Sequence, residues 1–174
     1  MMNLPNILTI SRLAFVIPVI LCLTTTKLGW NLLGAFFFFL ASFTDLADGF
    51  IARARGEVTA VGKLLDPLAD KILLLSALVP LVSLGRIPAW LAVAILAREF
   101  AVTGLRGMVA LKGLSVSAGE MGKVKTLLYA LALMLLMVHL QVLGMVFLIA
   151  GAVVAFYSAY GYFAAHREIF LEEG

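Results

Sequence analysis

Long apolar stretches follow one another along most of this chain, and short polar or glycine-containing breaks separate them. A helix needs about 20 mostly apolar residues to cross a membrane, and several segments meet or approach this length. They cover approximately Asn6–Thr25, Trp30–Arg53, Gly62–Leu84, Ala89–Leu111, Gly122–Leu140 and Gly144–His166. Breaks such as Gly85-Arg86-Ile87-Pro88 are typical of turns. The pattern predicts an all-α membrane protein with six transmembrane helices.

The composition supports this prediction. Of the 174 residues, 63% are hydrophobic and 13% are charged, and the mean hydropathy is +1.10. Soluble domains contain about 25% charged residues. The length fits one domain, so we expect residues 1–174 to form a single membrane domain. The one cysteine, Cys22, excludes a disulfide within the chain.

Basic residues are distributed unevenly between the two sides of the predicted bundle. Lys27 and Arg86 lie in the connections after the first and third segments, and the connection after the fifth segment has no lysine or arginine. All other basic residues fall on the opposite side. By the positive-inside rule, both termini should be cytoplasmic. Because orientation explains the net charge of +3, we expect no nucleic acid partner.

Four aspartates, the only ones in the chain, lie between the second and third segments. Asp45 and Asp48 are about one helical turn apart, as are Asp66 and Asp70, so each pair lies on one helix face. A charge in the middle of a membrane helix costs about 2.5–3.5 kcal/mol. We therefore expect these carboxylates to lie near the membrane interface, to be neutralised by cations, or both.

If the second and third segments are antiparallel neighbours, the two carboxylate pairs converge, and two divalent cations balance their charge. Ligands that are all oxygen favour Mg²⁺ or Mn²⁺ over zinc. Gly49 and Gly62 let a ligand come close to the backbone. Arg53 follows Asp45 by about two turns, so it shares a face with Asp45 and can bind a phosphate. Two metals flanked by an arginine are a recurrent arrangement for displacement at phosphorus.

Two alternatives explain the aspartates differently. They could form ion pairs at the helix ends with Arg53, Arg55, Lys63 and Lys71, although this explains neither the glycines nor the lack of aspartate elsewhere. They could also belong to a divalent-cation transporter, because carboxylates within membranes mark ion routes. Their gathering at one interface argues against a route that crosses the membrane.

Eight positions in this region fit the pattern D-x2-D-G-x2-A-R-x8-G-x3-D-x3-D without departure. They are Asp45, Asp48, Gly49, Ala52, Arg53, Gly62, Asp66 and Asp70. On this pattern the chain resembles the CDP-alcohol phosphatidyltransferases. The resemblance implies a homodimeric membrane enzyme of six helices. Such an enzyme uses two divalent cations and displaces CMP from a CDP-linked lipid with the hydroxyl of an alcohol.

Further similarity extends over nearly the whole chain. AREFAVTGLRG at residues 97–107 and GKVKT at residues 122–126 resemble one branch, the phosphatidylglycerophosphate synthases. This branch transfers a phosphatidyl group from CDP-diacylglycerol to sn-glycerol 3-phosphate in phospholipid biosynthesis. The implied location is the inner membrane, with the active site facing the cytoplasm. The same chemistry with inositol phosphate, phosphatidylglycerol or serine as acceptor stays open.

The resemblance also implies roles for single residues. Asp45, Asp48 and Asp66 would hold one metal ion, and Asp45, Asp66 and Asp70 would hold the other. Asp70 would also be the general base. The residues implied for the CDP-lipid site are Asn6, Thr9, Gly49, Ala52, Arg53, Thr59 and Gly62.

Several basic residues gather on the expected cytoplasmic side, and this observation does not depend on the resemblance. They are Arg98, Arg106, Lys112, Lys123 and Lys125. An anionic acceptor needs cationic partners, and we favour Arg98, Arg106 and Lys123 for its phosphate. Alternatively, these cations only orient the protein or bind anionic lipid. Glu99 and Glu120 are candidates for orienting them.

Overall fold

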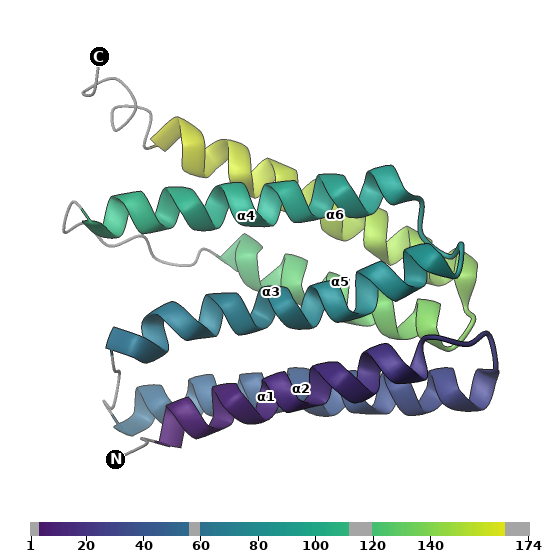
Figure 1. Cartoon of the computed structure of the whole chain (residues 1–174). Helices are drawn as coiled ribbons and strands as arrows, with labels where there is room; N and C mark the ends of the chain where they lie inside the picture. Colours follow the sequence, from purple (N-terminus) through teal and green to yellow (C-terminus); the bar gives the residue numbers. More distant parts are fainter. Residues whose placement is uncertain (1–3, 56–59, 112–119, 166–174) are drawn as a thin grey trace.

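Six α-helices make up the part of the chain that the structure describes, and no strand occurs within it (Figure 1). The computed structural model describes the backbone of residues 4–55, 60–111 and 120–165, and the side chains of residues 13–44, 67–110 and 121–165. The helices are α1 (Leu4–Cys22), α2 (Leu28–Arg55), α3 (Ala60–Ser83), α4 (Ala89–Leu111), α5 (Glu120–Met137) and α6 (Gln141–Ala165). The predicted all-α class and the six predicted helical segments are confirmed, with ends shifted by at most three residues.

Successive helices run in opposite directions, so the bundle has two distinct ends. The connections 23–27, 84–88 and 138–140 lie together at one end, which we call the loop end (Figure 1, right). The end of α2 and the start of α3 lie at the opposite end, as does the start of α1. Helix α1 packs against both α2 and α3, α4 packs against α3 and α6, and α5 packs against α6 and α2.

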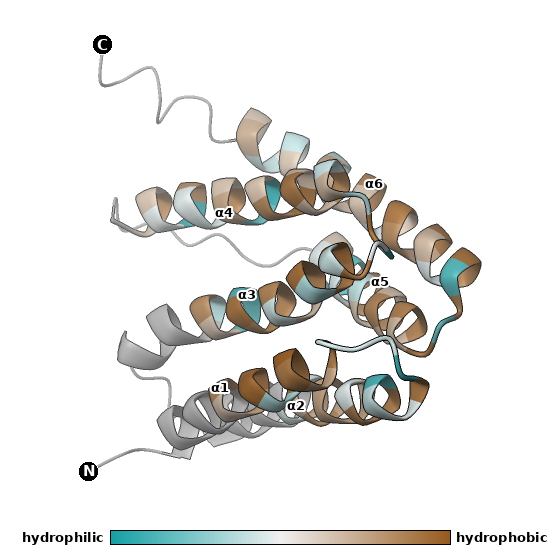
Figure 2. Cartoon of the chain, turned by 45° about the vertical axis from the view of Figure 1, so that its right-hand side comes forward, coloured by the Kyte–Doolittle hydropathy of each residue, from teal (hydrophilic) through white to brown (hydrophobic). Residues whose placement is uncertain are grey.

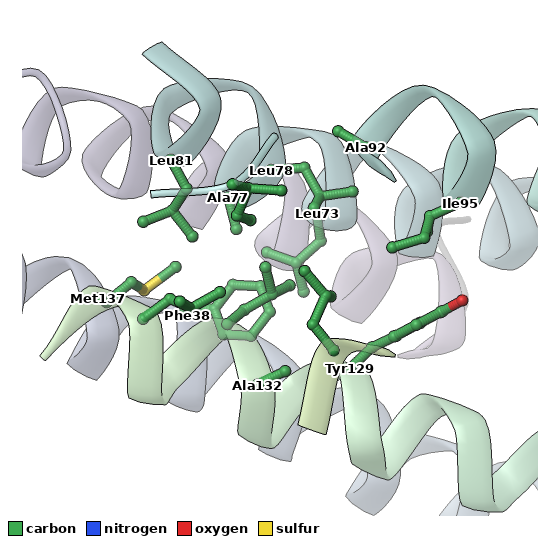
Figure 3. Close-up of a cluster of buried hydrophobic side chains, with 14 of the residues drawn as sticks. Phe38, Leu73, Ala77, Leu78, Leu81, Ala92, Ile95, Tyr129, Ala132 and Met137 are labelled. Atoms are coloured by element: carbon green, nitrogen blue, oxygen red, sulfur yellow. The ribbon is translucent and has the colours of Figure 1, made fainter. Parts of the chain in front are cut away.

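An apolar core fills the space between the helices, and apolar side chains also cover much of the outside. Leu78 and Leu81 of α3 and Met137 of α5 are fully buried in this core (Figure 3). Large apolar residues such as Trp90 and Val153 are exposed on the helix surfaces, and hydrophobic colours dominate those helices in Figure 2. Water-soluble monomers rarely expose extended apolar surfaces, so a lipid environment suits this exterior.

The apolar character of the described helices varies along the chain. Helix α6 is long and apolar enough to cross a membrane, and it is the one helix of this kind among the described residues. Shorter apolar helical stretches are Leu13–Cys22 and Leu28–Thr44. The crossing of the membrane by all six helices, and the cytoplasmic position of the termini, therefore stay predictions.

Helices α3 and α5 end at the loop end with the same hydrogen-bond pattern. The Gly85 and Arg86 amides donate to the carbonyls of Val82 and Leu81, and Gly85 has a φ of 70°. At the end of α5, the His139 and Leu140 amides donate to the carbonyls of Leu136 and Leu135, and His139 has a φ of 67°. This is the Schellman motif, whose left-handed position glycine adopts most easily. A histidine there must be held by other contacts.

Arg86 supplies those contacts. Its Nη1 donates to the carbonyls of Leu136 and Met137 at the end of α5, at 3.0 and 3.2 Å. Its Nη2 donates to His139 Nε2 at 2.7 Å. The amide group of the fully buried Asn31 lies 2.9 Å from His139 Nε2. These bonds join α2, the α3–α4 connection and the end of α5, and so fix the loop end.

Helices α5 and α6 pack closely against each other at Gly144. A Cβ atom built there would lie 2.6 Å from Leu136 Cγ and 3.0 Å from the Leu136 backbone nitrogen. Because the backbone nitrogen cannot rotate away, Gly144→Ala should lower the free energy of unfolding by about 1–3 kcal/mol. Thermal unfolding in detergent measures this loss. The control is Gly161→Ala on the same helix, where nothing lies within 4 Å of the added Cβ. Equal melting temperatures for both variants would contradict the prediction.

Candidate active site

The four aspartates lie on α2 and α3 toward the end opposite the loop end. The number of residues from Leu28, the first residue of α2, to Asp45 equals the number from Asp66 to Ser83, the last residue of α3. At 1.5 Å per residue both distances are about 25 Å. Since both reference ends belong to the loop end (Figure 1), Asp45 and Asp66 lie at similar levels in the bundle. The side chains of Asp45, Asp48 and Asp66 are outside the described part.

The residues predicted for the CDP-lipid site belong to the same end of the bundle or lie outside the described backbone. Asn6 and Thr9 are in the first turns of α1, which packs against both α2 and α3. Gly49, Ala52 and Arg53 are in α2, and Gly62 is near the start of α3. Thr59 lies outside the described residues. The structure brings these helix segments together but describes none of these side chains, so the site stays a prediction.

Asp70 is the one aspartate whose side chain is described, and it is exposed on α3. The next residue, Lys71, is 8% exposed. The Lys71 ammonium donates to the Pro67 carbonyl of its own helix at 3.0 Å. Among the described side chains, no group of three or more histidine, cysteine, aspartate or glutamate residues could hold a metal. The predicted metal ligands other than Asp70 lie outside this set.

A buried ion-pair cluster lies on α4 and α5, within the bundle. The Glu99 carboxylate accepts from Arg98 Nη1 at 2.8 Å and, through both oxygens, from Lys125 Nζ at 2.5 Å. Arg98 Nε also donates to the Ala155 carbonyl of α6 at 2.7 Å. Arg98 and Glu99 are 5% and 9% exposed. This cluster therefore ties α4 to both α5 and α6, and Glu99 has the orienting position that the sequence suggested.

Lys71 joins this cluster electrostatically from α3. Glu99 and Asp70 attract its ammonium group, whereas Arg106 and Arg98 repel it. Lys125 is in turn repelled by Arg98 and Lys71. Figure 2 shows hydrophilic bands on the otherwise apolar α3 and α4. Among the described side chains, the three cations Lys71, Arg98 and Lys125 outnumber the two carboxylates that act on them, Glu99 and Asp70. The cluster therefore carries an excess of positive charge, which an anion can neutralise.

The three residues predicted to bind the acceptor phosphate differ in burial and in their described partners. Arg98 is buried, with Nε and Nη1 engaged by Ala155 and Glu99. Arg106 is exposed two turns further along α4, within electrostatic range of Lys71. Lys123 is exposed, two positions from Lys125 on α5, and helix residues two apart do not face each other. The phosphate-binding role of all three stays a prediction.

Sequence reasoning assigned no binding role to Lys71, Lys125 or Tyr129, which the structure gathers near Glu99. One signal was available, because Lys125 and Tyr129 are four residues apart and therefore share a face of α5. No pattern in the sequence around Lys125 and Tyr129 indicates that this face of α5 meets Glu99.

Comparison with known proteins identifies the family. Residues 2–157 match the family model described as CDP-alcohol phosphatidyltransferase. The chain belongs to the CDP-alcohol phosphatidyltransferase family. This confirms the resemblance seen in the aspartate pattern, and it makes the end of the bundle that holds Asp45, Asp48, Asp66 and Asp70 the candidate active site of a phosphatidyltransferase.

Curated members of this family are similar over most of the chain. A Bacillus subtilis protein is 41% identical over 152 residues, covering 80% of this chain and 78% of its own. A Rickettsia bellii protein is 38% identical over 176 residues, covering 97% of both chains. A Pectobacterium atrosepticum protein is 35% identical over 179 residues, covering 98% of both. All three are named CDP-diacylglycerol–glycerol-3-phosphate 3-phosphatidyltransferase.

Proposed function

We propose that this phosphatidyltransferase transfers a phosphatidyl group from CDP-diacylglycerol to sn-glycerol 3-phosphate, giving phosphatidylglycerophosphate and CMP. The names of the curated relatives confirm the enzyme class expected from the sequence. The structural observation that carries the proposal is the buried cationic excess around Glu99. An acceptor with a phosphate group suits this cluster, whereas a zwitterionic acceptor such as serine gains less from it.

The four aspartates would hold two divalent cations, Mg²⁺ or Mn²⁺, because carboxylate oxygens are the ligands that these ions prefer. Enzymes of this family generally depend on divalent metal. Asp45 and Asp66 lie at similar levels on the antiparallel helices α2 and α3, which both pack against α1, and shared ligands require such matching levels. When bound, the cations would stabilise negative charge on the phosphate oxygens. The ion count and the assignment of each aspartate belong to this proposal.

The chain's own residues would bind both substrates and move one proton. Asn6, Thr9, Gly49, Ala52, Arg53, Thr59 and Gly62 would bind the CDP part of the donor lipid. Asp70 would accept the proton of the primary hydroxyl of glycerol 3-phosphate. The hydroxyl oxygen then forms a bond to the phosphorus that carries diacylglycerol. The bond from this phosphorus to the bridging oxygen breaks, and CMP leaves with that oxygen.

The proposed setting is the inner membrane, with six crossing helices and the aspartates on the cytoplasmic side. Helix α2 has 28 residues, or about 42 Å, and exceeds the hydrocarbon thickness of about 30 Å. Measured from the loop end, Asp48 lies about 30 Å along α2 and would reach the cytoplasmic interface, and Asp45 would lie about one turn inside it. The basic residues at the opposite end agree with this orientation. A homodimer and a single domain over residues 1–174 are part of the same proposal.

The deciding experiment measures CMP release from CDP-diacylglycerol by the purified protein in detergent. We expect release to require both glycerol 3-phosphate and Mg²⁺. Treatment with EDTA should stop it, and excess Mg²⁺ should restore it, because the aspartates hold exchangeable ions. Inositol phosphate, phosphatidylglycerol and serine are the control acceptors. Faster release with any of them would overturn the acceptor assignment. Metal flux into proteoliposomes without CMP release would instead favour the transporter.

A further inference from the structure

Tyr129 has an unusual hydroxyl group. Among the buried side-chain nitrogen and oxygen atoms in the described part of the chain, it is the one without a hydrogen-bond partner. Tyr129 is only 4% exposed, so bulk water does not replace the missing partner. Buried polar groups are normally paired, and an exception calls for an explanation such as a ligand or an ordered water.

The Tyr129 ring is held in place from several sides. It belongs to the apolar core, with the hydroxyl oxygen at the edge of the cluster and directed away from Phe38 and Met137 (Figure 3). On α6, a Cβ atom added to Gly151 would lie 2.8 Å from Tyr129 Cδ1. The ring therefore packs directly against the backbone of α6, and the hydroxyl has a defined position.

Tyr129 lies close to the charged cluster along α5. Lys125, which binds Glu99, is on the same helix face one turn away, and Glu99 and Arg98 act electrostatically on the Tyr129 hydroxyl. Glu99 does not accept from Tyr129, because the hydroxyl has no partner within hydrogen-bond distance, and the Glu99 oxygens accept from Arg98 and Lys125. A phosphate group would offer acceptor oxygens to the hydroxyl and negative charge to the lysines.

We propose that Tyr129 is a binding residue for the acceptor: its hydroxyl donates a hydrogen bond to the phosphate group of glycerol 3-phosphate, beside Lys125 and Lys71. This inference rests on the proposed function. Glu99 keeps Lys125 in place and partly neutralises the subsite when it is empty. The competing explanation is an ordered water that bonds to Tyr129 and serves the fold alone.

The test is Tyr129→Phe, which keeps the ring against Gly151 and removes the hydroxyl. The KM for glycerol 3-phosphate should rise about tenfold or more, as expected when a hydrogen bond to a charged group is lost. The KM for CDP-diacylglycerol should change less than about twofold. Without acceptor, the melting temperature should stay the same or rise, because an unpaired hydroxyl has been removed. The matched control is Tyr160→Phe, whose side chain is 77% exposed on α6.

Three results would overturn the inference: an unchanged KM for glycerol 3-phosphate, a rise only in the KM for CDP-diacylglycerol, or a lower melting temperature with an unchanged KM. The last is the result expected for a structural water. If the wild-type protein released no CMP with glycerol 3-phosphate, the proposed function would fail separately. Inorganic phosphate then tests Tyr129 alone: it should raise the melting temperature of the wild type more than that of Tyr129→Phe, and equal shifts would overturn the inference.

Discussion

Asp70→Asn should lower the rate of CMP release by about 10²–10⁴-fold, the usual contribution of a general base. Asparagine has nearly the same shape but cannot take the proton of the acceptor hydroxyl. The measurement is kcat with saturating CDP-diacylglycerol and glycerol 3-phosphate. Ser83→Ala, an exposed change at the far end of α3, is the control and should retain wild-type activity.

A titration with Mg²⁺ separates the two roles proposed for Asp70. If Asp70 only binds metal, a high concentration of Mg²⁺ should bring the rate of Asp70→Asn back toward that of the wild type. If Asp70 is the base, the rate stays low at every concentration. Normal turnover of Asp70→Asn would show that another group takes the proton.

Glu99→Ala should produce the largest loss of stability, about 3–5 kcal/mol, as measured when one partner of a buried ion pair is removed. The change leaves the buried Arg98 and the half-buried Lys125 without their shared carboxylate. Thermal or denaturant unfolding in detergent measures the loss. Thr126→Ala, an exposed position next to Lys125, is the control and should stay within about 0.5 kcal/mol of the wild type.

A double-mutant cycle keeps this prediction testable if Glu99→Ala does not fold. Glu99→Gln retains the size of the side chain, and Lys125→Met removes the cation that Glu99 binds most closely. Glu99→Gln leaves both Arg98 and Lys125 without a carboxylate partner, whereas the double variant leaves only Arg98. The losses of stability in the two single variants should therefore not add, and the coupling energy should exceed about 1 kcal/mol. Additive losses would mean that the pair contributes nothing to the stability of the bundle.

Most of the fold could be predicted because its signals are local. A helix in a lipid environment must be apolar along its length and must satisfy its own backbone hydrogen bonds, so apolar stretches and breaks such as Gly85 mark the helices directly. The aspartate pattern is local in the same sense, because helical spacing decides which residues share a face. The comparison with known families supports this pattern.

The proposed acceptor side of the site was harder to predict because its candidate residues come from different helices. The sequence pointed to several basic residues at one end of the bundle, and the choice of Lys123 over Lys125 had no local basis. In the structure Lys125 meets Glu99, whereas Lys123 lies two positions away on another side of α5. Two positions on a helix are a turn of about 200°, and only the placement of α4 shows which side faces inward.

The sequence by itself determined the number and length of the helices, their order, the acidic motif and the family, because each is written in spacing along one segment. Only the tertiary structure decided that Glu99 joins Arg98 to Lys125, that Lys71 is buried beside them, and that the Tyr129 hydroxyl lacks a partner. The physical reason is that burial and ion pairing depend on which helix faces meet, and this follows from the packing of all six helices together.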